Sequence, residues 1–394
     1  MDTPLYGPLT IDEWLRLNLQ HQGLLQPAAS AAAVIRQLGY VQIDSINVVE
    51  RAHHHVLHSR LPGYHPEQLQ QAIADKEVFE YWAHAAAYLP MSDYRYSLQR
   101  KQQLSQGDKH WFEPDEPLMR EVLARVRAEG PLKASDFEHS SDQRGSWWDW
   151  KPAKKALEQL FMRGELMVLR RERFQKVYDL AERVLPPGID TRVPDDDEFG
   201  RYLVNRFLNA NGFGSEAQFA YLRKGMRPVI KRVLAQGLEA GELQRFKVDG
   251  QQYFCPAELS AAPMIPERVW LLNPFDNLVI QRNRLKQWFG FDYQLEVYLP
   301  QEKRVYGYYS LAILWRQQFI GRVDVKADRP RQCLLLQNLV LEPEYANRSL
   351  DDVLLAELAR AIADYARFNA CERWKLVRSN HKGLKQLWRR QQWL

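Results

Sequence analysis

The stretch LEQLFMRGELMVLRRERFQKVYDL, residues 157–180, contains two periodicities that meet at Gly164. Before this glycine the apolar residues recur every three or four positions, which predicts an amphipathic helix. After it, apolar and polar residues alternate on both sides of a charged centre, which predicts a two-stranded hairpin. Because glycine adopts the left-handed conformation that commonly ends a helix, Gly164 predicts a tight turn between the two elements.

The same pattern occurs twice more, in LQQAIADKEVFEYW at 69–82 and in VLAQGLEAGELQRF at 233–246. Each segment predicts a helix, a tight turn and then an extended stretch, so the chain contains a weak internal repeat. A helix followed by a hairpin is the outline of a winged helix, in which the helix before the hairpin is the recognition helix. We therefore predict three tandem winged-helix units. The alternative is a generic helical array with incidental hairpins.

The last third of the chain differs from the rest. The segments FDYQLEVYL, RVYGYYSLAIL, QQFIGRVDVKA and QCLLLQNLVL are rich in branched and aromatic residues and predict strands, and a long helix is predicted at 350–369. The predicted fold class is α+β, with three winged-helix domains and a C-terminal β-barrel-like α/β domain. The predicted domains are residues 1–105, 106–190, 191–262 and 263–394.

Composition narrows the classes of protein. The 394 residues include 54 Lys or Arg and 49 Asp or Glu, and the net charge of +5 permits a nucleic-acid partner without requiring one. A hydrophobic content of 45% excludes intrinsic disorder. No apolar run reaches the roughly 18 residues of a membrane span, and the N-terminus lacks a cationic leader. The three cysteines lie far apart, which favours a reducing cytoplasm.

Several common chemistries are excluded by missing motifs, since the sequence contains no GxxxxGK[ST], GxSxG or HExxH. Six of the ten histidines cluster in residues 53–84. His54 and His58 have a spacing that can hold a metal on a helix, but no second ligand pair is evident, so we expect no metal. A helix through this segment places Asn47, Arg51, His54 and His58 on one polar stripe, which is typical of a solvated or nucleic-acid-facing surface.

The segment Val41-Gln42-Ile43-Asp44-Ser45 alternates apolar and polar residues. If it is extended, Gln42 and Asp44 share one side while Val41 and Ile43 point into the core. The chemistry of these residues alone favours a modest interpretation, in which Asp44 or Ser45 caps the following helix and Gln42 lies on the surface.

The ordered strings VQIDSINVVERAHHHVLHSRL, FEYWAHAAAYLP, NPFDNLVIQRNR and FGFDYQLEVYLP resemble the bacterial AlkZ/YcaQ winged-helix DNA glycosylases. The resemblance extends from about residue 11 to about residue 331. It implies three winged helices and a barrel-like domain around a DNA channel, and a Gln-Φ-Asp catalytic motif, here Gln42-Ile43-Asp44, where Φ is apolar. This variant resembles the branch of broad substrate range. The resemblance also implies double-stranded DNA with N7-alkylpurine adducts or crosslinks as the partner.

Chemical reasoning agrees with this resemblance. Alkylation at purine N7 makes the base cationic and a good leaving group, so one carboxylate that stabilises an oxocarbenium-like sugar and activates water is sufficient. We therefore predict a monofunctional DNA glycosylase without a cofactor, monomeric and associated with the nucleoid. The alternative is a non-enzymatic winged-helix transcriptional regulator.

Any single basic residue is more often an ordinary surface charge, and clusters of basic residues are better candidates for DNA contacts. The predicted DNA-binding residues are Asn47, Arg51, His54, His58, Lys151, Lys154, Lys155, Arg171, Arg173, Arg322 and Lys326.

Overall fold

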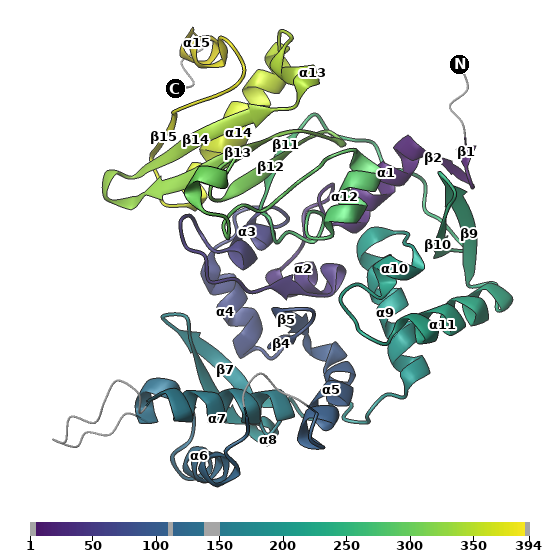
Figure 1. The fold of residues 1–394 in the computed structure, drawn as a ribbon, viewed down its shortest axis with the longest axis vertical. Coiled ribbons are helices and arrows are strands. Elements are labelled where there is room, and N and C mark those ends of the chain that lie inside the picture. Colours follow the sequence, from purple (N-terminus) through teal and green to yellow (C-terminus); the bar gives the residue numbers. More distant parts are fainter. Residues whose placement is uncertain (1–4, 109–112, 138–149, 391–394) are drawn as a thin grey trace. The chain divides into compact units, whose positions relative to one another are not determined.

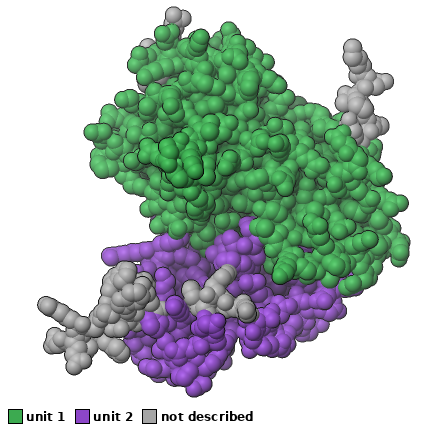
Figure 2. Space-filling model, viewed as in Figure 1, with its two compact units in different colours: residues 1–65, 204–394 green, residues 66–203 purple. Residues whose placement is uncertain are grey.

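The computed structural model describes residues 5–108, 113–137 and 150–390, and it combines helices with several small sheets in a mixed α/β fold (Figure 1). The chain forms two compact units (Figure 2). The first unit comprises residues 1–65 and 204–394, and the second comprises residues 66–203.

The second unit is built mainly from helices, with a β-hairpin and a small sheet of order β6-β8-β7. Strands β7 and β8 pair antiparallel and form the hairpin predicted from the opening stretch. Its elements are α4 (Pro66–Ala74), β4 (Val78–Trp82), β5 (Ala86–Pro90), α5 (Arg95–Ser105), α6 (Glu116–Glu129), β6 (Leu132–Lys133), α7 (Trp150–Arg163), β7 (Leu166–Glu172), β8 (Gln175–Leu180) and α8 (Ala181–Val184). Helix α9 (Asp196–Asn211) follows along the chain, and its first turn is capped by Asp195, whose Oδ1 accepts the Glu198 N–H.

Before its C-terminal sheet, the first unit contains short helices and one long hairpin. The hairpin pairs β9 with β10 antiparallel over their full length. The elements are β1 (Leu5–Tyr6), β2 (Leu9–Thr10), α1 (Ile11–His21), α2 (Ala31–Leu38), β3 (Val41–Gln42), α3 (Ala52–His58), α10 (Glu216–Phe219), α11 (Arg227–Glu239), β9 (Leu243–Val248) and β10 (Gln251–Pro256). Helix α10 is short, and the segment after Phe219 turns at Leu222, which has a positive φ of 54°.

The three predicted helix–hairpin turns are present, and they share one geometry. The turn that follows each helix contains one residue with a positive φ: 57° at Lys76, 85° at Gly164 and 70° at Gly241. In each case the next residue is a glutamate whose backbone N–H reaches back to the carbonyl five residues earlier. This is the Schellman arrangement, which satisfies the last carbonyls of a helix. The repeat in the sequence therefore encodes a repeated turn, whereas the number of complete winged-helix domains and their boundaries stay predictions.

The C-terminal part of the first unit contains a five-stranded sheet of order β11-β12-β13-β14-β15. The pairings are antiparallel except for β14 with β15, which are parallel. The order is linear from one edge strand to the other, so the sheet is open, and the predicted barrel-like closure is wrong. Its elements are β11 (Val269–Leu272), α12 (Arg282–Phe289), β12 (Ser310–Trp315), β13 (Gln318–Asp328), β14 (Cys333–Leu341), α13 (Pro343–Ala346), α14 (Asp352–Phe368), β15 (Arg373–Leu376) and α15 (Leu384–Arg390).

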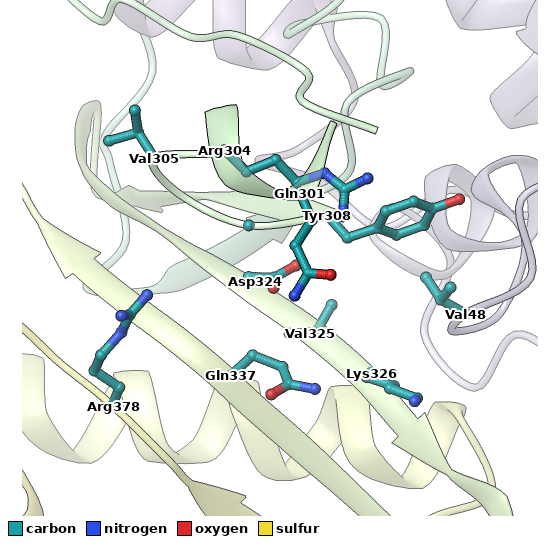
Figure 3. A pocket seen from close by; sticks show the side chains of 11 residues that line it. Val48, Gln301, Arg304, Val305, Tyr308, Asp324, Val325, Lys326, Gln337 and Arg378 are labelled. Atoms are coloured by element: carbon teal, nitrogen blue, oxygen red, sulfur yellow. The ribbon is translucent and has the colours of Figure 1, made fainter. Parts of the chain in front are cut away.

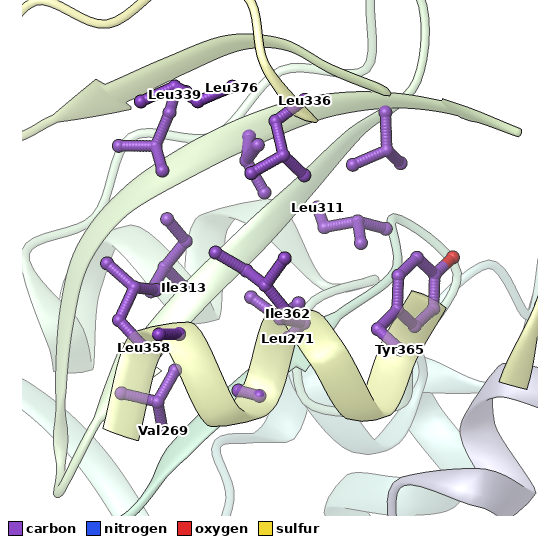
Figure 4. Close-up of a cluster of buried hydrophobic side chains, with 14 of the residues drawn as sticks. Val269, Leu271, Leu311, Ile313, Leu336, Leu339, Leu358, Ile362, Tyr365 and Leu376 are labelled. Carbon is purple, nitrogen blue, oxygen red and sulfur yellow. The ribbon is translucent and has the colours of Figure 1, made fainter. Parts of the chain in front are cut away.

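Both faces of this sheet are buried. On one face, α14 packs its Leu358, Ile362 and Tyr365 against alternate residues of the strands (Figure 4). The other face is covered by apolar residues of α1, α12 and the segment after α12. Strand β12 is buried at every position because it has a packed layer on each side.

The predicted strand FDYQLEVYL at 291–299 is wrong, because the segment forms an irregular loop. Buried and exposed residues alternate in this segment because single side chains are buried, and not because the backbone pairs as a strand. Tyr293 donates its hydroxyl to the Ser310 carbonyl, and Glu296 accepts the backbone N–H groups of residues 305–307. Alternating burial in a loop mimics the strand pattern, since periodicity does not reveal which backbone groups pair.

Candidate active site

The Gln42-Ile43-Asp44 motif begins on a very short strand. Strand β3 ends at Gln42, so Asp44 lies in the loop that follows rather than in the strand. Val41 and Ile43 are buried, as the alternation predicts. Gln42 is only 9% exposed, whereas Asp44 is half-buried. The amide is therefore nearly enclosed and the carboxylate is the more accessible group of the two.

Asp44 is oriented by a bond within its own loop. Its Oδ1 accepts the Ile46 backbone N–H at 2.8 Å, which closes a turn of the kind that Asp side chains favour. Among the described residues, Oδ2 has no hydrogen-bond partner. Burial raises the pKa of the Asp44 carboxyl, and the Ile46 N–H offsets part of that increase. A carboxylate that is partly desolvated and has one free oxygen is a suitable base for an attacking water.

Residues 43–51, which we call the catalytic loop because of the role proposed below for Asp44, are not the start of a helix. Helix α3 begins at Ala52, and Arg51 is its N-cap residue with extended backbone angles (φ −60°, ψ 149°). The prediction that Asn47 and Arg51 share a helical stripe with His54 and His58 is therefore wrong. The physical reason is that distant groups take the backbone hydrogen bonds that a helix would have used.

These distant groups come from the C-terminal part of the first unit. Arg329 donates to the Asn47 carbonyl at 3.1 Å, to the Asn47 Oδ1 at 2.9 Å and to the Val49 carbonyl at 3.4 Å. The Ala327 N–H donates to the Val48 carbonyl at 2.9 Å. Val49 also packs into the core beneath the five-stranded sheet. The sheet therefore sets the position of the loop that carries Asp44.

A second connection lies at the other end of α3. Arg60 forms a bidentate ion pair with Asp276 at 2.7 and 3.0 Å, and the two side chains are 1% and 0% exposed. The same guanidinium donates to the carbonyls of Gln22 and Val56. Asp276 belongs to the NPFD turn of the sequence, and its role is to brace α3 against the segment that follows β11.

His54 and His58, which were predicted to contact DNA, make contacts within the protein. His54 Nδ1 lies 2.7 Å from the Tyr64 hydroxyl. The His58 ring stacks on Phe368 with centroids 4.1 Å apart. Burial lowers the pKa of His58 to about 4, so this imidazole is neutral at physiological pH and brings no charge to a phosphate. We therefore propose no DNA contact for either ring.

The predicted basic contacts fall into two groups. Arg171 and Arg322 are bound inside the protein: Arg171 pairs with Glu80 at 2.7 Å, and Arg322, which is 2% exposed, pairs with Glu342 at 2.8 Å. The side chain of Lys151 lies outside the described residues. The exposed candidates are Lys154 and Lys155 on α7, Arg173 at the β7–β8 turn and Lys326 on β13.

A cavity of about 540 Å³ lies beside the catalytic loop in the first unit, and Val48 contributes to its wall (Figure 3). Arg304, Lys326 and Arg378 line it from three separate segments. The sequence analysis identified only Lys326, because no motif connects three cations that are far apart along the chain.

Comparison with known proteins identifies the family of the chain. The family model described as DNA glycosylase AlkZ-like matches residues 35–368. The solved structure of the Streptomyces sahachiroi DNA glycosylase AlkZ has a TM-score of 0.64 with this chain at 16% sequence identity, covering 93% of this chain and 98% of that chain. The chain belongs to the AlkZ-like DNA glycosylase family, and it is a hydrolase of N-glycosyl bonds that acts in DNA repair. The resemblance in the sequence is confirmed, and its assignment to the Gln-Φ-Asp branch stays a prediction.

Among the described residues, no helix combines the length and the apolar character that crossing a membrane requires.

Proposed function

We propose that this glycosylase excises cationic N7-alkylated purines from double-stranded DNA and unhooks N7-linked interstrand crosslinks. The observation that carries the proposal is Asp44, a half-buried carboxylate with one free oxygen in the described structure. Burial, rather than a neighbouring acid, raises its pKa. A single carboxylate without an acid partner suits a substrate whose leaving group needs no protonation.

The proposed reaction breaks the bond between C1′ and N9 of the purine. The electron pair of that bond neutralises the positive charge that alkylation placed on the base, and the sugar becomes oxocarbenium-like. The Asp44 carboxylate stabilises this cation and takes a proton from the water that attacks C1′. Gln42, two residues earlier, orients the water through its amide. The products are the neutral free base and an abasic site.

A lysine nucleophile has no place in this scheme. Residues 41–61, which contain the motif and α3, include no lysine. A Schiff-base mechanism that also cleaves the strand would need one beside the sugar. We therefore propose a monofunctional enzyme, acting as a monomer and without a cofactor.

The position of Asp44 also suits a crosslink. A base tied to the opposite strand cannot rotate fully into a closed pocket. Asp44 lies in a loop and keeps part of its surface exposed, so DNA can approach it without complete base flipping. The proposed phosphate contacts are the exposed Lys154, Lys155, Arg173 and Lys326, together with Lys151. Two residues of the catalytic loop are added to them, the exposed Asn47 and the half-buried Arg51.

The test uses duplex DNA containing N7-methylguanine or an N7-linked nitrogen-mustard crosslink, followed by heating in alkali. The protein should leave abasic sites that break, whereas a transcriptional regulator leaves the strands intact. Asp44→Asn keeps an oxygen that can accept the Ile46 N–H and removes only the charge. We expect its single-turnover rate to fall by about 10²–10⁴-fold while DNA affinity changes little. Ser45→Ala, at the exposed neighbour, is the matched control.

The pH profile gives a second readout of the same proposal. Because burial raises the pKa of Asp44, activity should be lost at a higher pH than for an exposed aspartate as the solution is acidified. This acidic limb should disappear in Asp44→Asn. Comparable excision of hypoxanthine or uracil, or unchanged turnover by Asp44→Asn, would contradict the proposed chemistry.

A further inference from the structure

The cavity beside the catalytic loop has an unusual charge distribution. Arg304 comes from the loop between α12 and β12, Lys326 from β13 and Arg378 from the segment after β15 (Figure 3). The remaining polar lining includes the amides of Gln301 and Gln337. Three cations from three segments therefore face one space of about 540 Å³.

Each arginine is oriented through one nitrogen and leaves the others available. Arg304 Nε donates to the Leu299 carbonyl at 2.9 Å, and Arg378 Nε donates to Asn338 Oδ1 at 3.1 Å. Within the described residues, the terminal nitrogens of both guanidinium groups make no hydrogen bond. The exposed ammonium group of Lys326 likewise has neither a hydrogen bond nor an ion pair there. The two guanidinium groups are therefore oriented with hydrogen-bond donors to spare, and the ammonium group of Lys326 is available beside them, which is what an anion site requires.

The one carboxylate in the lining is occupied by the protein itself. Asp324, which is 9% exposed, accepts the Tyr309 backbone N–H through Oδ1 at 2.7 Å. A Cβ on Gly307 would lie 2.2 Å from this carboxyl group, so only glycine fits at that position. The acid therefore fixes the backbone of the wall. Its charge also attracts Arg304, but the lining still carries three cations against one carboxylate.

The same wall is held by a second buried acid. Glu296 accepts the backbone N–H groups of Val305, Tyr306 and Gly307 at 2.8 to 3.1 Å. The loop that presents Arg304 is thereby rigid, although its Val305 side chain is 68% exposed and the Tyr308 ring is 36% exposed. Exposed apolar surface on a rigid loop, next to cations, matches the sugar and phosphate of a nucleic-acid backbone.

We propose that this cavity, the Arg304–Lys326–Arg378 pocket, binds a backbone phosphate of the substrate DNA close to the lesion. Val48 forms part of its wall and lies four residues after Asp44 on the catalytic loop, so the pocket and the carboxylate meet the same stretch of DNA. The phosphate accepts hydrogen bonds from the three cations, and the adjoining sugar contacts Val305 and Tyr308. This inference rests on the proposed catalytic role of Asp44.

The first test measures binding rather than chemistry, with the full chain and an undamaged fluorescent duplex over a series of salt concentrations. Lys326→Ala and Arg378→Ala should each weaken binding about five- to tenfold at about 0.1 M salt and lower the slope of log K against log salt by about 0.9. Lys286→Ala removes an exposed lysine of α12 that is already paired with Asp292 outside the pocket, so it should change binding less than about twofold.

The second test locates the phosphate. Single phosphates on both sides of N7-methylguanine are replaced in turn by neutral methylphosphonate, and the affinity loss caused by Lys326→Ala is measured on each duplex. If the pocket holds one phosphate, the loss should vanish when that phosphate is neutral and persist on the other duplexes. The position should lie within a few nucleotides of the modified base. Equal losses on every duplex, or no change of affinity and salt slope in any variant, would overturn the proposal.

The two proposals fail in different ways. If Asp44 is not catalytic, Asp44→Asn keeps its turnover while the pocket variants still lose affinity. If the pocket holds no phosphate, Lys326→Ala and Arg378→Ala bind DNA normally while Asp44→Asn loses its turnover. Melting temperatures close to that of the unmodified protein confirm that the pocket variants are folded, which is expected because Lys326 and Arg378 are exposed.

Discussion

The three helix–hairpin turns and the catalytic loop are stabilised in opposite ways. Each turn is closed by backbone bonds that span three to five residues around Lys76, Gly164 or Gly241. The local bonds of the catalytic loop run instead from a backbone N–H to a side-chain carboxylate, from Ile46 to Asp44 and from Arg51 to Glu50. Its long-range bonds come from Ala327, Arg329 and Asn369, and the last two lie 282 and 319 residues away from the groups that they bind.

This difference distinguishes structure that a short stretch of sequence determines from structure that depends on distant parts of the fold. A turn is determined by a short stretch of sequence and forms wherever that stretch occurs. The loop takes its shape only when the five-stranded sheet and α14 are in place, because these elements supply its hydrogen-bond partners. The geometry of the active site therefore depends on the fold of the whole first unit, and the substitutions below test that dependence.

The largest effect is expected at the buried ion pair that braces α3. Asp276→Ala leaves the Arg60 guanidinium charged, unpaired and 1% exposed. We expect the free energy of unfolding to fall by about 3–5 kcal/mol in equilibrium urea unfolding. Asp292→Ala is the matched control, since its pair with Lys286 is largely exposed and should change the free energy of unfolding far less. Equal losses in the two variants would show that the brace is not needed.

Sequence patterns predicted the helices and hairpins well where the code is local. Helix α11, with Pro228 in its first turn, ends at Glu239, and Gly241 follows in the tight turn predicted from the segment 233–246. The helix predicted with Asn47 and Arg51 on its polar stripe would bury Ile46, Val49 and Ala52 through their helical spacing. Their burial has another cause, since they pack against the core of the C-terminal sheet.

The candidate site shows the same limit. The resemblance selected Gln42 and Asp44, and the structure places them on β3 and the loop after it. No pattern distinguished Lys326, which faces a cavity, from Arg322, which points into the interior four residues earlier on β13. The side chain of a basic residue has the same charge in both settings, so burial decides its role.

The next effect concerns the position of Asp44. Arg329→Ala removes three hydrogen bonds to the catalytic loop, and we expect single-turnover excision to fall by about 10–100-fold while DNA affinity stays within about threefold. A looser loop also exposes Asp44, so the pKa of its carboxyl group should decrease and the acidic limb of the pH profile should move to lower pH.

Arg331→Ala is the control for Arg329→Ala, since Arg331 belongs to the same short turn, is 78% exposed in its side chain and binds only Asp328 among the described residues. It should leave both the rate and the pH profile unchanged. A weaker affinity and a smaller salt slope in Arg329→Ala, without a change in rate at saturating protein, would instead identify Arg329 as a phosphate contact.

The smallest effects are expected at the local turns, and their signs are opposite at equivalent positions. Gly241 has a φ of 70° and open space where a Cβ would lie, so Gly241→Ala adds only backbone strain and should cost about 1 kcal/mol. Lys76 already carries that strain at a φ of 57°. Lys76→Gly should therefore raise the free energy of unfolding by about 0.5–1 kcal/mol. Lys76→Ala retains the strain and should bring no such gain.

These turn variants should leave the catalytic rate at saturating protein unchanged, because none of the bonds described above for the catalytic loop involves either turn. If Gly241→Ala lowered the rate as strongly as Arg329→Ala, the active site would depend on the hairpins as much as on the sheet. Since the loop receives its hydrogen bonds from β13, from Arg329 and from the end of α14, we expect stability to change alone in the turn variants and catalysis to change with little loss of stability in Arg329→Ala.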